Sequence, residues 1–206
     1  MIIIQTRFNM RKLELKDVAA YLPYGMNFIN KDGVILRMDA LQVSGYNVWA
    51  HQRYVKGKKD ERDINYPYLN SINCSGEGDY LRKIKPILRP MSDLTKSIVV
   101  KGYNDDKEFV PIVALAERAF EIEINNITGF SQSGKCRGVN FIFDYVEYGF
   151  SYSEDIDAFH TQIISPKQNI VTDNQSQLFD LLNQWHFDYR NLIGKGLAID
   201  INTLNQ

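Results

Sequence analysis

The feature that most constrains the fold is an amphipathic pattern close to the C-terminus, within residues 178–204. Seven apolar residues recur there at spacings that place them on one face of a helix. They are Leu178, Leu181, Leu182, Trp185, Tyr189, Leu192 and Ile193. A helix with such a stripe must bury it against another element. The pattern therefore predicts a helix that closes the core, followed by a short terminal strand at residues 197–201.

Capping residues mark where the helices begin. Asn174, with Gln177 three residues later, is a capping-box arrangement that predicts the start of the C-terminal helix. Pro111 suits the first position of another helix, which we expect to end at about Phe120. A further periodic pattern predicts a helix over residues 10–22.

The segments between these helices have the patterns of strands. Residues 26–38 alternate around an Asp-Gly pair, which is typical of a hairpin, and a third strand at 46–55 completes an antiparallel meander. In the second half, residues 139–146 and the shorter segments 121–124 and 161–164 are expected strands. We expect residues 125–138 and 147–157 to be loops.

Two prolines, at positions 86 and 90, restrict residues 81–90 to extended backbone. This segment suits an edge strand or a crossover, followed by a short helix with Ser92 as its N-cap. The whole pattern predicts an α+β fold, in which a mostly antiparallel sheet is packed by three or four helices. We expect one domain over residues 10–206, preceded at 1–9 by an N-terminal extension or edge strand.

Bulk features indicate a cytoplasmic protein. Apolar runs are far shorter than the roughly 20 residues of a membrane-spanning helix, and the N-terminus lacks the pattern of a signal peptide. No membrane partner is expected. Cys74 and Cys136 are far apart and outside any paired motif, which favours two free thiols over a disulfide framework or a zinc site.

Charge is unevenly distributed along the chain. Residues 1–103 contain 17 Lys and Arg against 10 Asp and Glu, whereas residues 104–206 contain 7 against 15. One interpretation is a basic surface for nucleic acid, opposed to an acidic face. The favoured interpretation is that the two halves interleave in one fold, so that their charges largely neutralise.

Seven basic residues form a speculative ligand- or nucleic-acid-binding set, and tyrosines flank several of them. The set is Arg53, Lys56, Lys58, Lys59, Lys83, Lys85 and Arg89. Basic residues among aromatics can bind single-stranded nucleic acid through phosphate contacts and base stacking. The favoured alternative is a solvated loop together with the exposed, charged face of an edge strand.

Evidence for catalysis is weak in the sequence. The phosphate-binding, nucleophile-elbow, zinc-protease and dinucleotide motifs are absent, so we predict no catalytic residue and no cofactor. Glu154, Asp155 and Asp157 lack the spacing of a calcium loop and are expected to be a solvated acidic loop. A weaker metal-site alternative is His186 with Asp188, although a structural role is favoured for this histidine.

Three stretches together resemble a family of small uncharacterised proteins carried by phages and prophages of gut Bacteroidales. They are LKDVAAYLPYGM at 15–26, IKPILRPMSDLTK at 84–96 and WHFDYRNLIGKGLAIDINTL at 185–204, with FVPIVAL at 109–115 as a weaker fourth. Asn191 and Gly194 depart from the family pattern, which leaves the end of the C-terminal helix at Gly194 or Gly196. The resemblance implies a phage-encoded accessory protein in the cytoplasm of a bacterial host.

These observations favour a non-catalytic binding protein whose partner is a host or phage protein or a small nucleotide ligand. A nucleic-acid-binding protein is the first alternative, and a metal-dependent hydrolase is the second. If the protein binds a partner, we expect the loops at 53–62, 70–79 and 125–138 to make the contact, because scaffolds commonly present function on loops.

Overall fold

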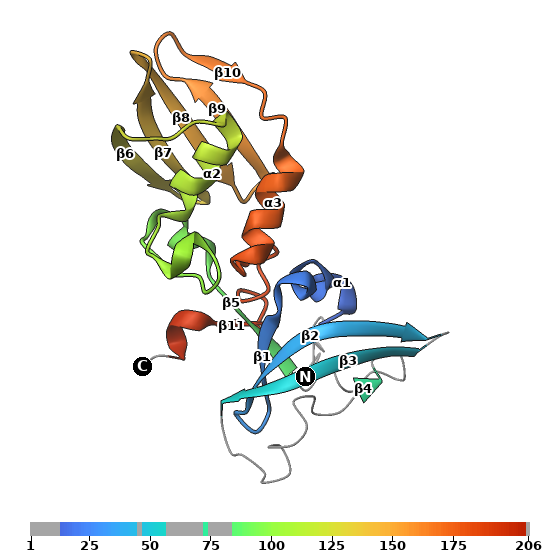
Figure 1. The fold of residues 1–206 in the computed structure, drawn as a ribbon. Coiled ribbons are helices and arrows are strands. Elements are labelled where there is room, and N and C mark those ends of the chain that lie inside the picture. Colours follow the sequence, from blue (N-terminus) through green and yellow to red (C-terminus); the bar gives the residue numbers. More distant parts are fainter. Residues whose placement is uncertain (1–12, 45–46, 57–71, 74–83, 205–206) are drawn as a thin grey trace, which may run out of the picture. The chain divides into compact units, whose positions relative to one another are not determined.

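The structure, a computed structural model, describes the backbone of residues 13–44, 47–56, 72–73 and 84–204, and the side chains of residues 13–38 and 84–204. The chain divides into two compact units (Figure 1). Unit 1 comprises Met1–Ile87 and Arg190–Thr203, and unit 2 comprises Leu88–Tyr189 and Leu204–Gln206. Each unit contains its own sheet. The α+β class with mostly antiparallel pairing is confirmed, whereas two sheets replace the one that the sequence predicted.

The sheet of unit 1 has six strands in the order β11-β5-β1-β2-β3-β4. The strands are β1 (Met26–Asn30), β2 (Ile35–Ser44), β3 (Asn47–Lys56), β4 (Ile72–Asn73), β5 (Ile84–Leu88) and β11 (Ile199–Asp200). The predicted meander of the first three strands is confirmed, since β2 pairs antiparallel with both β1 and β3. The predicted terminal strand is also present, although it is only two residues long.

The first hairpin of this sheet is set by Asn30 as well as by the Asp-Gly pair. The Asn30 side-chain oxygen accepts hydrogen bonds from the backbone N–H groups of Asp32 and Val34, each at 2.9 Å. Gly33 has a φ of 77°, which a residue with a Cβ adopts only at a cost. The turn is therefore held by a side-chain bond that mimics a backbone turn.

The helix predicted over residues 10–22 is shorter and tighter in the structure. Helix α1 (Leu15–Val18) passes directly into the 3-10 helix η1 (Ala19–Tyr24), which contains Pro23 and ends at Gly25 with a φ of 70°. The positive φ of Gly25 favours glycine, because a residue with a Cβ is strained in this conformation whatever the space around it. Val18 and Leu22 are buried as predicted, whereas Ala19 is exposed.

Strand β5 does not lie at an edge, contrary to the prediction from its prolines. It lies between β11 and β1, and its antiparallel pairing with β1 places Pro86 opposite Phe28. Pro86 lacks a backbone N–H, so it cannot donate a hydrogen bond to either neighbouring strand. The following helix η3 (Met91–Thr95) is a 3-10 helix with Pro90, not Ser92, at its N-cap.

The sheet of unit 2 has five strands in the order β10-β9-β8-β7-β6, each antiparallel to its neighbours. The strands are β6 (Ile127–Ser133), β7 (Cys136–Phe143), β8 (Val146–Ser153), β9 (Ala158–Ile163) and β10 (Gln168–Ile170). Two predicted loops are therefore wrong, because residues 125–138 contain most of the β6–β7 hairpin and residues 147–157 contain most of β8.

These hairpins were missed because their turns lack the usual glycine pairs. The β7–β8 turn is made by Asp144 and Tyr145, with φ values of 48° and 65°. Such a primed turn normally selects Asn-Gly or Asp-Gly. The predicted strand at 121–124 is also wrong, because the N–H groups of Ile122 and Ile124 bind Glu117 on the preceding helix.

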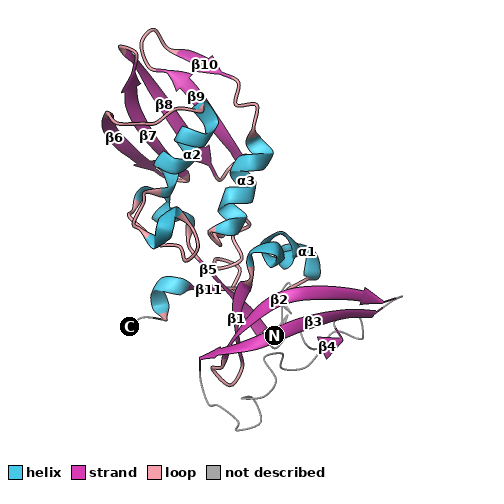
Figure 2. Cartoon of the chain, in the orientation of Figure 1, coloured by secondary structure: helices cyan, strands magenta, loops and turns pink. Residues whose placement is uncertain are grey.

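Two α-helices belong to unit 2 and lie on one face of its sheet (Figure 2). Helix α2 (Pro111–Phe120) has Pro111 at its first turn, as predicted. Helix α3 (Gln175–Gln184) begins after Asn174, also as predicted. It ends at Gln184, so neither Gly194 nor Gly196 is its boundary. The short helices η4 (Asn104–Asp106) and η5 (Ile201–Thr203) complete the described elements.

The predicted capping box at the start of α3 is replaced by contacts to the end of α2. Asn174 makes no side-chain cap bond within its own helix. Its Nδ2 donates to the backbone oxygen of Arg118 at 3.0 Å, and Arg118 Nη2 donates to Gln177 Oε1 at 2.7 Å. Asn174 and Gln177, which the sequence predicted to cap α3, therefore connect α3 to the end of α2.

The core of unit 2 lies between its sheet and these helices. Leu178, Leu182 and Trp185 are buried in it, as the amphipathic pattern predicted, and Leu181 is half-buried against it. Trp185 stacks edge-on to Tyr103 at 5.0 Å between ring centroids. Leu192 is also fully buried, but it belongs to unit 1 and lies beyond the helix. No helix in the described part of the chain is long and apolar enough to cross a membrane.

Candidate binding surface

The seven basic residues of the predicted binding set divide between the two units. Arg53 and Lys56 lie on β3 and Lys85 on β5, all in unit 1, whereas Arg89 belongs to unit 2. Lys58, Lys59 and Lys83 lie outside the described residues, as do the side chains of Arg53 and Lys56. Lys85 is exposed. The existence of one basic surface therefore stays a prediction.

Arg89 serves the fold of unit 2. Its side chain is only 14% exposed, and its Nη1 lies 3.9 Å from Asp93 Oδ2. The other carboxylate oxygen of Asp93 accepts a 2.7 Å bond from Lys96 Nζ. The guanidinium also lies 6.0 Å from the centre of the Phe187 ring, within reach of a cation–π contact. An anion at this guanidinium would have to compete with a buried carboxylate.

The backbone of Arg89 joins the end of α3. Arg89 N–H donates to the backbone oxygen of His186, and Asp188 N–H donates to the backbone oxygen of Arg89, each at 2.8 Å. These two bonds form an isolated parallel bridge between Arg89 and Phe187. The sequence stretches 84–96 and 185–204 therefore meet at this bridge.

His186 occupies a special backbone position. Its φ is 59°, in the left-handed region, and its N–H donates to the backbone oxygen of Asn183 at 3.1 Å. The next residue, Phe187, donates to the backbone oxygen of Leu182 at 2.9 Å. This pair of bonds is a Schellman motif, in which the left-handed residue is usually glycine. His186 ends α3, a role that the sequence does not signal because the glycine is missing.

The acidic residues 154–157 are engaged with neighbouring strands of the sheet. Asp155 accepts a 3.0 Å bond from Lys135, and Glu154 lies 3.8 Å from Arg137. Asp157 accepts a 2.7 Å bond from the hydroxyl of Tyr152. The predicted acidic loop is the β8–β9 turn, in which Asp155 and Asp157 are exposed. It contacts the β6–β7 hairpin through Lys135 and Arg137, and β8 through Tyr152. Within residues 13–38 and 84–204, no group of three or more His, Cys, Asp or Glu is placed to hold a metal ion.

Burial and these contacts shift the pKa values of Tyr152 and Lys135. Burial raises the pKa of the Tyr152 phenol well above its ordinary value, and the hydrogen bond to Asp157 adds to the rise. The hydrogen bond to Asp155 raises the pKa of Lys135. Both shifts keep the protonated forms at neutral pH, so neither group is poised for acid–base chemistry there.

The open face of the unit 2 sheet is the surface that distinguishes this unit. Side chains alternate across a strand, and the residues that face the helices include Val139, Phe141 and Phe150. The residues between them point to the opposite face. The open face is defined here by Ser131, Gly138, Asn140, Gly149, Ser151, His160 and Gln162, none of which belongs to the hydrophobic core. The same alternation places the register partners Ile142 and Glu147 on this face, next to Asn140 and Gly149.

Side chains lean over the two central glycines of this open face. A Cβ at Gly138 would lie 2.8 Å from the backbone oxygen of Phe150 and 2.9 Å from Cβ of Ser151. A Cβ at Gly149 would lie 3.0 Å from Nε2 of Gln162. The open face is therefore closely packed at these positions, where Ser131 and Ser151 approach Gly138, and Gln162 and Ile164 approach Gly149. Sequence reasoning missed it because Gly, Ser and Asn suggested an irregular loop.

Comparison with protein-family models, with curated proteins and with solved structures finds no match.

Proposed function

We propose that the chain is a non-catalytic binding protein whose partner contacts the open face of unit 2. The observation that carries this proposal is the chemical contrast between the two faces of one sheet. One face holds a core of apolar and aromatic side chains, while the other presents hydroxyl, amide and imidazole groups on rigid strands. Such groups both donate and accept hydrogen bonds, and they cost less to desolvate than charges do.

A protein partner suits this surface better than a small ligand. Small molecules bind in concave sites that enclose most of their surface, whereas protein interfaces are broad and depleted of charge at their centre. The seven residues that define the open face include no Asp, Glu, Lys or Arg, and the Glu147 carboxylate on the same face accepts a hydrogen bond from Thr128 Oγ1 at 2.9 Å. The partner is a host or phage protein, and the setting is the cytoplasm of a bacterial host, as the family resemblance implies.

The test compares two arginine variants, each at a position whose side chain is exposed to solvent. His160 is exposed on β9 within the open face, and Tyr145 is 99% exposed at the β7–β8 turn. Native mass spectrometry of protein purified from infected host cells should show the same partner on the wild type and on Tyr145→Arg. His160→Arg should lose that partner while its circular dichroism spectrum is unchanged. Retention by His160→Arg would refute the open face as the site.

A nucleic-acid-binding function is the second candidate, and the partition of charge between the units favours it. Unit 1 contains 16 Lys and Arg against 10 Asp and Glu, whereas unit 2 contains 8 against 15. The units therefore keep the asymmetry of the two sequence halves, because the two halves fold for the most part into separate units. A net positive unit attracts phosphates, and such binding weakens steeply with salt.

This candidate predicts binding of single-stranded DNA or RNA at low salt, measured by fluorescence anisotropy. Lys85→Glu should weaken it, because Lys85 is the one member of the basic set in unit 1 whose side chain is described as exposed. Lys167→Glu is the control, since Lys167 is an exposed lysine of unit 2. Undetectable binding at low salt would exclude the candidate.

A further inference from the structure

Strand β6 is an outer strand of the unit 2 sheet, and no strand in the described part of the chain pairs with its free edge. Its seven residues contain neither a charged residue nor a proline. Edge strands usually carry lysine, proline or inward-pointing charge, because free backbone groups otherwise pair with another chain. The register of β6 is irregular only between Ile127 and Gly129.

The backbone groups on the free edge can be assigned from the pairing with β7. Ile142 on β7 donates its N–H to the backbone oxygen of Asn126, so its backbone points toward the β6 side. Bonded and non-bonded pairs alternate along an antiparallel ladder. Asn140 and Gly138 therefore bond to β6, and their register partners are Gly129 and Ser131. Phe130, which lies between these two partners, and Gln132, which follows Ser131, direct their N–H and C=O groups outward.

The charge distribution favours a second copy at this edge. Unit 2 carries an excess of acidic residues, yet residues 125–143 contain none. The two basic residues of this segment, Lys135 and Arg137, are already within reach of Asp155 and Glu154. The Glu147 carboxylate on β8 accepts a 2.9 Å hydrogen bond from Thr128 Oγ1 of β6. A strand without charged side chains places no like charges opposite each other when it pairs with a second copy.

We propose that two copies of the chain pair antiparallel through β6 about a twofold axis at Phe130. Phe130 is the central residue of β6 and is 49% exposed. On the axis it exchanges both backbone hydrogen bonds with its own copy, and the two rings pack side by side. Gln132 of each copy then faces Thr128 of the other. The pairing joins two five-stranded sheets into one of ten strands.

This self-association does not depend on the proposed partner binding. Sedimentation velocity over a wide range of concentrations should show a monomer–dimer equilibrium for the wild type. Phe130→Lys and Phe130→Asp should each be monomeric, because the axis places like charges side by side. An equimolar mixture of the two variants should form a heterodimer, since lysine then faces aspartate. Phe143→Lys is the control, because Phe143 is 44% exposed but lies outside β6.

The heterodimer is the decisive arm, because only a register that places residue 130 opposite itself restores pairing in the mixture. Circular dichroism confirms that each variant is folded, and Phe130→Thr supplies a milder variant that should weaken the dimer at least tenfold. A wild type that stays monomeric at every concentration overturns the proposal. So does a mixture that remains monomeric, or a Phe143→Lys variant that loses the dimer as fully as Phe130→Lys.

Discussion

Replacing His186 tests whether the end of α3 is set by backbone conformation. Because His186 has a φ of 59°, alanine there keeps the clash between Cβ and the following carbonyl, whereas glycine removes it. The clash is worth about 1–2 kcal/mol. Glycine also makes the unfolded chain more flexible, which offsets about 0.4–1 kcal/mol. We therefore expect His186→Gly to be about 1 kcal/mol more stable than His186→Ala.

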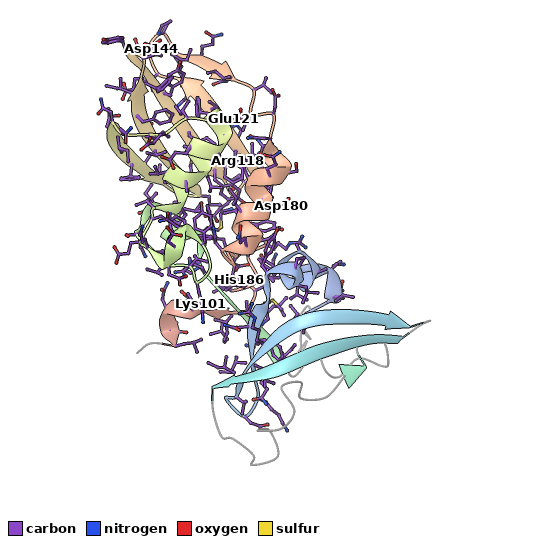
Figure 3. The ribbon with its side chains drawn as sticks, viewed as in Figure 1. Lys101, Arg118, Glu121, Asp144, Asp180 and His186 are labelled. Carbon is purple, nitrogen blue, oxygen red and sulfur yellow. The ribbon has the colours of Figure 1, made fainter. Side chains whose placement is uncertain are left out.

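Comparing glycine with alanine isolates this backbone term, because both variants lose every side-chain contact of His186. The matched control is Asp180, an exposed residue within α3 (Figure 3). In a helix interior glycine is less stable than alanine by about 1 kcal/mol, so the order of stability should reverse there.

The measurement is the free energy of unfolding from urea titrations followed by circular dichroism. The expected result is opposite signs for the glycine-minus-alanine difference at positions 186 and 180. Equal signs at the two positions would refute the Schellman assignment, since residue 186 would then behave as ordinary helix. If His186→Ala matched the wild type while His186→Gly was destabilised, the left-handed conformation would likewise be excluded.

Four further predictions follow from single contacts. Glu121, which ends α2 with a φ of 55° (Figure 3), should give about 0.5–1 kcal/mol of added stability when replaced by glycine, measured by urea unfolding. Gly138→Ala should cost about 1–3 kcal/mol because its Cβ meets backbone, whereas Gly129→Ala, with open space around it, should cost little. Trp185→Ala should cost about 3–5 kcal/mol through the cavity it leaves, measured in the same way. Because the pKa of Tyr152 is raised in the folded state, its phenol stabilises that state fully below about pH 10, and this stabilisation is lost as pH rises further. Tyr152→Phe should therefore show a smaller fall in the free energy of unfolding at alkaline pH.

The parts of the fold that the sequence predicted depend on local rules. Pro111 at the first turn of α2 and the Asp-Gly turn of the first hairpin were found because their chemistry dictates the backbone within a few residues. The burial of Trp185 followed from periodicity alone. These are positions where one short-range cause decides the structure.

The parts that were missed depend on residues in uncommon conformations or on distant partners. Asp144 and Tyr145 make a primed turn without glycine, so no turn signal in the sequence marks the start of β8. The strand predicted at 121–124 bends back because Glu117 captures its N–H groups. The open face was not predicted for a related reason. Strands that contain glycine for close packing have a composition similar to that of a loop.

The bridge between Arg89 and Phe187 explains why the most distinctive stretches of the sequence indicated no chemistry. Arg89 directs its side chain to buried Asp93 and its backbone to the residues that end α3. Phe187 is fully buried, and His186 supplies a backbone conformation. The roles of these residues are to pack the core and to end helix α3, and neither role involves a ligand. A partner is therefore better sought on the open face and on β6, where small or uncharged side chains stand on a backbone that the core has already fixed.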